Sequence, residues 1–153
     1  MAAEPYTAAV QIAAAPEVVF DYFTRPDLLV RWMGTNAVLD PRPGGEFALD
    51  VYRISVRGHY IEVDRPNRLV IAWGHEGSAV LPPGASTVEV TLTRNANGTR
   101  VVLAHRDLPE VEAPKHAEGW QHFLDRLRVL GTGADPGPDP WRTPSARYQG
   151  DQR

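Results

Sequence analysis

The sequence predicts an α+β protein in which a curved antiparallel sheet of about six to seven strands closes around a long C-terminal helix, with two short helices after the first strand. Three observations predict this arrangement. Segments of strand-like character are separated by short turn sequences through most of the chain, and the segment 115–130 has apolar residues at helical spacing. The length of 153 residues is that of one domain.

The N-terminal segment is expected to form a strand followed by two short helices. Residues 6–12 alternate in polarity as a strand with one buried face does. Pro16 stands where a helix can begin, because the first turn needs no backbone N–H, and apolar residues after it share one face. Pro26 opens a second short helix in the same way, and Gly34 ends it.

Residues 36–106 are expected to form an antiparallel meander. The turn at 64–67 contains proline and asparagine, which suit a tight connection between neighbouring strands. The turn at 95–98 ends in Asn-Gly, which readily adopts the positive φ angles of a hairpin turn. The strands delimited by these and the other turns are 36–40, 46–51, 56–63, 68–73, 86–93 and 99–106.

Strand parity assigns residues to the two faces of this sheet, because successive side chains point to opposite sides. In each of the last two predicted strands, valine or leucine occupies every second position and forms one face. In the final strand this face also includes His105. In the strand 68–73 the larger residues share the face of Trp73, and the smaller ones lie opposite. The interior face is therefore expected to carry Leu69, Ile71, Trp73, His75, Val88, Val90, Leu92, Val101, Leu103 and His105.

The C-terminal part divides into a helix and a tail. The segment 115–130 is the longest predicted helix, and its inward side consists of His116, Trp120, Phe123, Leu127 and Leu130. The tail contains four glycines and four prolines and has too few apolar groups to build another element. We therefore expect one domain over 1–130 and a disordered tail over 131–153, with Trp141 and Tyr148 as its only candidate anchors.

Composition excludes several classes of function. Lysine and arginine number 16 against 19 acidic residues, for a net charge of -3, and no basic stripe is present to contact nucleic acid. The absence of cysteine removes disulfides, thiolate metal sites and thiol nucleophiles. No apolar run approaches the roughly 18 residues of a membrane-spanning helix. We expect a cytoplasmic protein that neither binds nucleic acid nor inserts into a membrane.

No metal or cofactor is expected. The five histidines stand at positions 59, 75, 105, 116 and 122, and no pair has the spacing that places two metal ligands on one helix. The sequence also lacks the nucleophile elbow of hydrolases, the phosphate-binding P-loop and the dinucleotide-binding fingerprint. Hydrolase, nucleotide-binding and nicotinamide-dependent functions therefore have no support.

A series of local motifs runs through residues 7–130. In order they are Ala15-Pro16-Glu17-Val18-Val19-Phe20, Trp32, Pro43-Gly44-Gly45-Glu46-Phe47, Gly58-His59-Tyr60-Ile61-Glu62-Val63, Pro66-Asn67-Arg68-Leu69-Val70 with Trp73, Gly98-Thr99-Arg100-Val101 with His105, and His116-Ala117-Glu118-Gly119-Trp120. In this order and spacing the chain resembles the START-like superfamily, also called SRPBCC or Bet v 1-like, in its activator-of-Hsp90-ATPase-homologue-like branch. The resemblance implies a helix-grip fold, and the tail lies outside it.

Together, the resemblance and the strand parity imply an apolar cavity between the sheet and the last helix. Its wall is expected to combine large aromatic rings with imidazoles able to orient a ligand. Parity leaves His59 and Tyr60 as alternatives for one position, and ordinary core packing is the alternative for each aromatic residue. The candidate ligand-binding residues are Trp32, Phe47, His59, Tyr60, Trp73, His105, His116, Trp120 and Phe123.

The favoured function is non-enzymatic binding or sequestration of a hydrophobic, aromatic or polyketide-like small molecule, in natural-product biosynthesis or self-resistance, by a monomer or weak homodimer. Proteins that the chain resembles bind lipids, hormones and polyketides, a few are aromatases or cyclases, and one group stimulates a chaperone ATPase. Two alternatives follow: a polyketide cyclase or aromatase in which His105 or Tyr60 moves a proton, and a chaperone-interacting module. Binding and cyclisation both need an interior that side chains leave incompletely filled.

Overall fold

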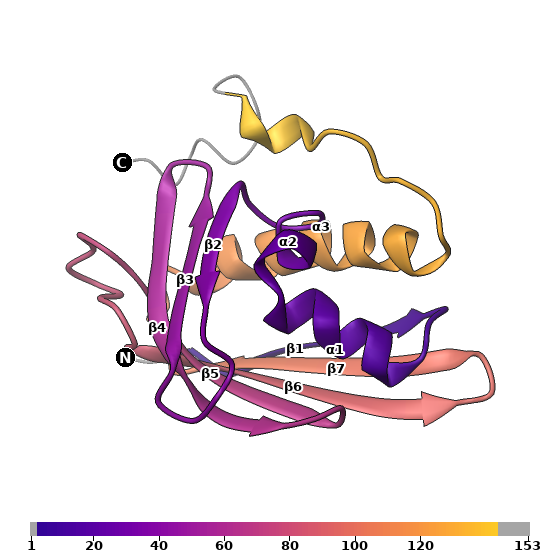
Figure 1. Cartoon of the computed structure of the whole chain (residues 1–153). Coiled ribbons are helices and arrows are strands. Elements are labelled where there is room, and N and C mark those ends of the chain that lie inside the picture. The colour runs from indigo at the N-terminus through magenta and orange to yellow at the C-terminus, as the bar shows by residue number, and fades with distance from the viewer. Residues whose placement is uncertain (1–2, 144–153) are drawn as a thin grey trace.

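A computed structural model describes residues 3–143 of the chain (Figure 1). In chain order the elements are β1 (Tyr6–Ile12), α1 (Pro16–Thr24), α2 (Pro26–Leu29), β2 (Asn36–Leu39), β3 (Glu46–Val51), β4 (Ile54–Asp64), β5 (Arg68–His75), β6 (Ser86–Asn95), β7 (Gly98–Arg106), α3 (Ala113–Gly131) and the 3-10 helix η1 (Pro140–Arg142). This succession confirms the predicted α+β class.

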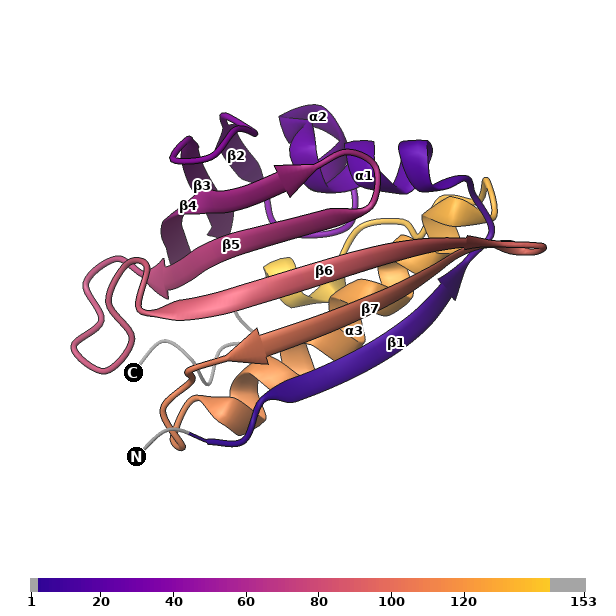
Figure 2. The same ribbon diagram turned by 90° about the horizontal axis from the view of Figure 1, so that it is seen from below.

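The strands form one seven-stranded sheet in the order β1-β7-β6-β5-β4-β3-β2, and every neighbouring pair is antiparallel. Strands β2 to β7 follow chain order as a meander, and β1 lies at the far edge beside β7. Figure 2 shows the sheet curving around α3, which lies along its concave side. The helix-grip fold is thereby confirmed.

The Asn-Gly hairpin forms where the sequence predicts it. Asn95 pairs with Gly98 at the end of the β6–β7 ladder. Gly98 has a φ of 125°, and a Cβ atom there would lie 2.2 Å from the carbonyl oxygen of Ile12, so that only glycine fits the turn. β6 continues to Asn95 and β5 to His75, both slightly beyond the predicted ends.

Both N-terminal helices begin at the prolines that predicted them, Pro16 and Pro26. The first buries Val19, Phe20 and Phe23 against the interior. The second is shorter than predicted and ends at Leu29. Beyond Leu29 the chain continues in tight turns, and Gly34 takes a positive φ of 84° before β2 begins.

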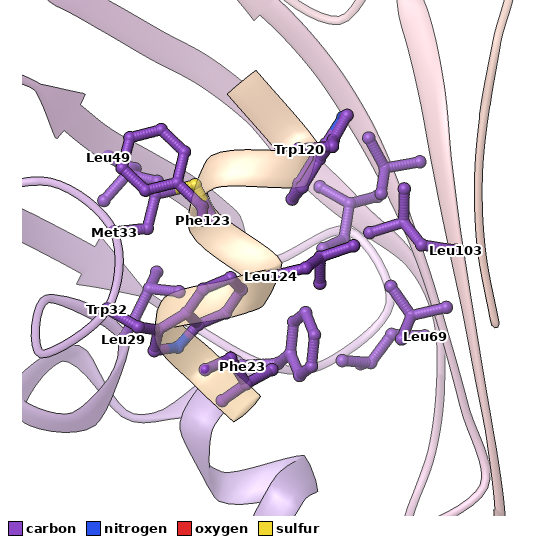
Figure 3. Packing of buried hydrophobic residues seen from close by; sticks show 14 of the residues in the cluster. Phe23, Leu29, Trp32, Met33, Leu49, Leu69, Leu103, Trp120, Phe123 and Leu124 are labelled. Carbon is purple, nitrogen blue, oxygen red and sulfur yellow. The ribbon is translucent and has the colours of Figure 1, made fainter. Parts of the chain in front are cut away.

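The long helix α3 begins at Ala113, slightly before its predicted start, because Pro114 fits the first turn of a helix. Its buried side consists of His116, Gly119, Trp120, Phe123, Leu124, Leu127 and Leu130. Figure 3 shows Phe123 beside Met33 and Leu49, and Trp120 on the side of Leu103. Each large apolar side chain buried in this way stabilises the fold by about 1.5–3 kcal/mol, which holds α3 against the sheet.

Residues 132–143, here called the strap, leave the end of α3 and turn back over it (Figure 1). Trp141 is buried, and its ring stacks on the ring of His122 with centroids 3.7 Å apart. The structure therefore differs from the expectation of disorder over this part of the tail, because α3 supplies a partner ring that composition alone does not reveal. The other candidate anchor, Tyr148, lies outside the described residues.

Candidate ligand-binding cleft

An apolar cleft lies between the N-terminal half of α3 and the end of the sheet formed by β3, β4 and β5. Its free space is about 20 Å³, roughly what one water molecule needs. The residues that line it, here called the cleft residues, are Met33, Val51, Val56, Trp73, His75, Lys115, His116, Gly119, Trp120 and Phe123. The prediction of an incompletely filled interior is therefore wrong for this closed structure.

Aromatic rings fill the space in which a guest was expected. The rings of Trp73 and Trp120 lie 5.2 Å apart between centroids and are tilted by 45°. Phe47 packs 5.7 Å from Trp73 and meets Tyr60 edge to face at 5.6 Å. Such pairs contribute about 0.5–1.5 kcal/mol each beyond the area that they bury. The structure thus brings these four predicted residues into one packed array.

His105 is completely buried, and both of its ring nitrogens have partners. Its Nδ1 accepts a hydrogen bond of 3.0 Å from the indole N–H of Trp120, which assigns the ring proton to Nε2. Nε2 donates to the hydroxyl of Ser86 at 2.8 Å, and that hydroxyl donates to the carbonyl of Trp73 at 2.6 Å. Burial is the main cause that lowers the pKa of His105, and the charges of two neighbouring histidines lower it further. The pKa lies well below its ordinary value, so the ring is neutral at pH 7.

Neither residue considered for proton transfer has a reactive atom available in this structure. His105 uses both nitrogens within the core and is a hydrogen-bonded packing residue. Tyr60 is also completely buried, and its hydroxyl donates to the carbonyl of Phe23 at 3.3 Å. Burial, and then the charge of Asp40, raise the pKa of Tyr60 further above its ordinary value. The geometry therefore gives no support to a cyclase that works through these two groups.

Two histidines form the outer edge of the cleft. The ring of His75 stacks on that of His116 with centroids 5.2 Å apart, and Nδ1 of His116 lies 3.0 Å from the carbonyl oxygen of Glu112. Burial, and then the charges of His116 and Lys115, lower the pKa of His75 to about 4. His75 is therefore neutral at pH 7. Lys115 lies 3.6 Å from the carboxylate of Glu112 at the same edge.

Trp73 carries a polar group that the fold leaves unsatisfied. Its side chain is 4% exposed, and its buried indole N–H has no hydrogen-bond partner among residues 3–143. An unpaired buried donor of this kind costs about 1–3 kcal/mol relative to a paired one. Trp73 is one of the cleft residues, so the unsatisfied side chain is part of the cleft wall.

Four of the nine predicted site residues are cleft residues: Trp73, His116, Trp120 and Phe123. The other five do not line the cleft: Phe47, Tyr60 and His105 pack in the core, and Trp32 and His59 have other roles. Trp32 is buried, but its indole N–H donates to the carbonyl of Tyr22 at 2.9 Å, so it anchors the α2 region to α1. His59 is exposed and stands opposite Glu46 in the β3–β4 ladder. Because Tyr60 takes the interior position, the expectation that His59 contacts a ligand there does not fit the structure.

Six cleft residues were not singled out as candidates from the sequence: Met33, Val51, Val56, His75, Lys115 and Gly119. Strand parity could have identified two of them, because His75 lies on the same face of its strand as Trp73, and Val56 lies on the same face as Tyr60. The sequence pattern does not place Met33 and Lys115 in the cleft, because their positions depend on how the helical segments dock on the sheet.

A second polar cluster ties the strap to both walls of the fold. Asp139 is 5% exposed, and its carboxylate accepts a hydrogen bond of 2.5 Å from the hydroxyl of Tyr52 and lies 2.8 Å from Nε2 of His122. It also accepts the backbone N–H of Trp141 at 2.9 Å. Burial alone would raise the pKa of Asp139, but these hydrogen bonds outweigh burial and hold its pKa below the ordinary value. Asp139 thus joins α3 to the β3–β4 turn.

The remaining charges of the described residues are largely paired at the surface. A row of ion pairs crosses β4 to β7 and consists of Glu62, Arg68, Glu89 and Arg106. Exposed pairs contribute at most about 1 kcal/mol, so this row is a solvated face. Within residues 3–143, no group of three or more potential metal ligands is arranged to hold an ion, and no helix has the length and apolar character needed to cross a membrane.

A curved antiparallel sheet wrapped around a C-terminal helix, with an apolar cleft between them, defines a START-like helix-grip domain. Residues 13–131 match the family model described as Activator of Hsp90 ATPase homolog 1-like protein. The chain belongs to this family. The strap lies beyond the matched residues.

Solved structures of related domains share the fold. An AHSA1-like protein from Rhizobium etli is 38% identical, with a TM-score of 0.72 over 94% of this chain and 91% of that chain. A protein of the dynemicin biosynthetic locus is 22% identical, with a TM-score of 0.73 over 86% of this chain and 48% of that chain. An Hsp90 activator from Plasmodium falciparum is 24% identical, with a TM-score of 0.68 over 82% of this chain and 94% of that chain. Among curated proteins, none matches the chain.

Proposed function

We propose that the protein binds an uncharged, apolar small molecule with an aromatic ring in the cleft between α3 and the sheet. The observation that carries this proposal is the composition of the cleft wall. Two tryptophans, Phe123 and Met33 surround the space, and partly exposed His75 and Lys115 form its edge. Apolar walls with a few polar groups are typical of small-molecule sites.

Binding requires the cleft to open, because the closed space holds about one water molecule. A two-ring guest that buries about 200 Å² of apolar surface gains about 5 kcal/mol at ~25 cal/mol per Å². The free energy of opening has to stay below this gain for binding to be measurable. Met33 is suited to yield, because its unbranched side chain has three rotatable bonds.

The polar groups of the wall favour an uncharged guest. His75 and the adjoining His105 both have lowered pKa values and are neutral at pH 7. Lys115 lies at the edge of the cleft, close to Glu112. A charged group carried past this edge into the apolar part of the cleft would lose its hydration, which is costly.

A solved neighbour of the same fold comes from the dynemicin biosynthetic locus, and this favours a natural product as the class of guest. Another solved neighbour is described as an Hsp90 activator, which corresponds to the alternative of a chaperone-interacting module. The exposed large apolar residues of the described chain stand on five separate elements or loops and are Val18, Val38, Ile61, Val80 and Val111. The cleft residues, by contrast, form one defined site, and we propose ligand binding alone.

Titration with N-phenyl-1-naphthylamine, an uncharged fluorescent aromatic probe, tests the proposal. We expect a saturable rise in fluorescence at one probe per chain. Met33→Trp adds bulk to the cleft and should weaken binding at least tenfold, while Val38→Trp adds the same ring at an exposed position and should leave binding unchanged. Equal affinities in both variants, or no saturable binding to the wild type, would overturn the proposal.

A readout on the wild-type protein covers the case in which Met33→Trp fails to fold. In a ¹H–¹⁵N spectrum, the probe should shift the indole N–H signals of Trp73 and Trp120, which line the cleft. The signal of Trp32 should stay in place, because that N–H is bonded to Tyr22 outside the cleft lining. Uniform small shifts of all three signals would contradict binding in the cleft.

A further inference from the structure

The indole N–H groups of Trp32, Trp73 and Trp120, which are all buried, differ in whether they have a hydrogen-bond partner. Trp32 donates to the carbonyl of Tyr22 at 2.9 Å, and Trp120 donates to Nδ1 of His105 at 3.0 Å. The buried N–H of Trp73 has no partner among the described residues. Because buried indole N–H groups usually find a partner, this exception points to a role outside packing.

The position of Trp73 indicates what that role is. Its ring forms part of the cleft wall and lies 5.2 Å from the ring of Trp120. Phenylalanine would fill much of the same space without an unpaired donor, so packing alone does not account for the indole. We propose that the Trp73 N–H donates a hydrogen bond to the bound molecule, which is therefore an aromatic compound with a neutral acceptor such as a ketone, quinone or ether oxygen. This inference rests on binding in the cleft as proposed above.

Neighbouring groups narrow the class of acceptor. Both nitrogens of His105 are already bonded within the core, so they do not compete for the guest. His75 is neutral, and Lys115 lies at the edge beside Glu112. A carboxylate bound next to Trp73 would lose its hydration, and Lys115, the cation among the cleft residues, already lies beside the carboxylate of Glu112. A neutral oxygen satisfies the donor without that cost.

A single water molecule is the competing partner for Trp73, because the space of about 20 Å³ matches its size. If water is the only partner, the indole N–H has no influence on which guests bind. The two explanations therefore differ in ligand preference, and a comparison of guests separates them.

The test measures dissociation constants by calorimetry for 2-acetylnaphthalene and 2-isopropylnaphthalene, which share a ring system and differ in the acceptor. Wild type, Trp73→Phe and Trp32→Phe are compared through the ratio of the two constants. We expect Trp73→Phe to reduce the preference for the ketone roughly fivefold to tenfold, the value of one neutral hydrogen bond. Trp32→Phe removes an indole that is bonded elsewhere and should keep the wild-type ratio.

The possible outcomes separate this inference from the proposed function. If both guests bind and the ratio is the same in wild type and Trp73→Phe, the donor role is overturned while binding stands. If neither guest binds the wild type, the proposed function fails. If Trp73→Phe does not fold, the ¹H–¹⁵N signal of the Trp73 indole in the wild-type protein provides the test. We expect its proton to move downfield with the ketone and not with the hydrocarbon. Equal shifts with both guests would overturn the donor role.

Discussion

At the scale of single residues, His105 connects the sheet to the helix. Its ring lies between the hydroxyl of Ser86 on β6 and the indole of Trp120 on α3, and this bonding orients Trp120 within the interior. Strand parity predicts that His105 faces inward. It does not identify Ser86 as the partner, because that contact depends on the β6–β7 register, in which Val88 stands opposite His105.

Tyr60 and His59 show the limit of parity. Alternation along β4 places the two side chains on opposite faces but does not say which face is inside. The structure settles this through Phe47, whose ring meets that of Tyr60, while the register shifts just beyond, between Tyr60 and Glu62. The unpaired N–H of Trp73 is equally invisible in the sequence, because it depends on what every neighbouring group bonds to.

We expect the free energy of unfolding to fall as pH is lowered from 7. The pKa of His75 is about 4, and that of His105 is also below the ordinary value of 6.5, so the unfolded chain binds more protons than the folded chain below pH 6.5. Stability is complete above this range and is lost on acidification, by up to about 1.4 kcal/mol per pH unit for each histidine. Urea unfolding at several pH values between 7 and 5 measures the slope.

Two variants separate the histidines in this experiment. His75→Gln removes one partly buried, neutral imidazole and should give a shallower slope than the wild type. His59→Gln changes an exposed histidine and should leave the slope unchanged. If the free energy of unfolding of His75→Gln depended on pH as steeply as that of the wild type, the claim that His75 is neutral in the folded protein would be contradicted.

At the scale of elements, α3 could be predicted from its helical spacing, whereas the strap could not. The glycines and prolines of the tail favour disorder, and Trp141 gains its partner only when the chain turns back over His122. The strap also depends on Asp139, whose hydrogen bonds reach both α3 and Tyr52 in the β3–β4 turn. Contacts of this kind between distant segments leave no local pattern in the sequence.

We expect Asp139→Asn to lower the free energy of unfolding by about 1–3 kcal/mol, because an amide cannot accept hydrogen bonds on both sides as the buried carboxylate does. Asp135→Asn is the matched control: this strap residue is exposed and only its Oδ1 accepts the backbone N–H of Gly137, so its effect should stay within about 0.5 kcal/mol. Chemical denaturation at pH 7 measures both.

The same pair of variants tests whether the strap restrains the cleft. Since Asp139 joins the two walls that must separate for a guest to enter, Asp139→Asn should speed the association of N-phenyl-1-naphthylamine in stopped-flow fluorescence. Asp135→Asn should associate at the wild-type rate. Identical rates in all three proteins would show that the strap does not limit opening.

At the scale of the whole molecule, the order of elements and the hairpins follow from turn chemistry and periodicity, which are local properties that the sequence displays. The filling of the interior is not local. Phe47, Trp73 and Trp120 come from three different elements, and whether their rings meet or leave a cavity depends on the curvature of the sheet and the depth at which α3 docks. For this reason an open cavity was expected where the structure has a closed cleft.

The fold itself does not select a function, because related domains of the same architecture carry different descriptions. The case for ligand binding therefore rests on the cleft residues, above all on the aromatic wall and the unpaired donor of Trp73. The strap lies beyond residues 13–131, which match the family model, and Asp139 holds it to α3.

A crystal structure of the protein with 2-acetylnaphthalene tests most directly whether the closed cleft opens for an apolar aromatic guest. We expect the naphthalene ring between Trp73 and Trp120, the ketone oxygen within about 3 Å of the Trp73 indole nitrogen, and α3 displaced from the sheet. A guest bound only on the outer surface, with the rings of Trp73 and Trp120 still in contact, would contradict opening of the cleft.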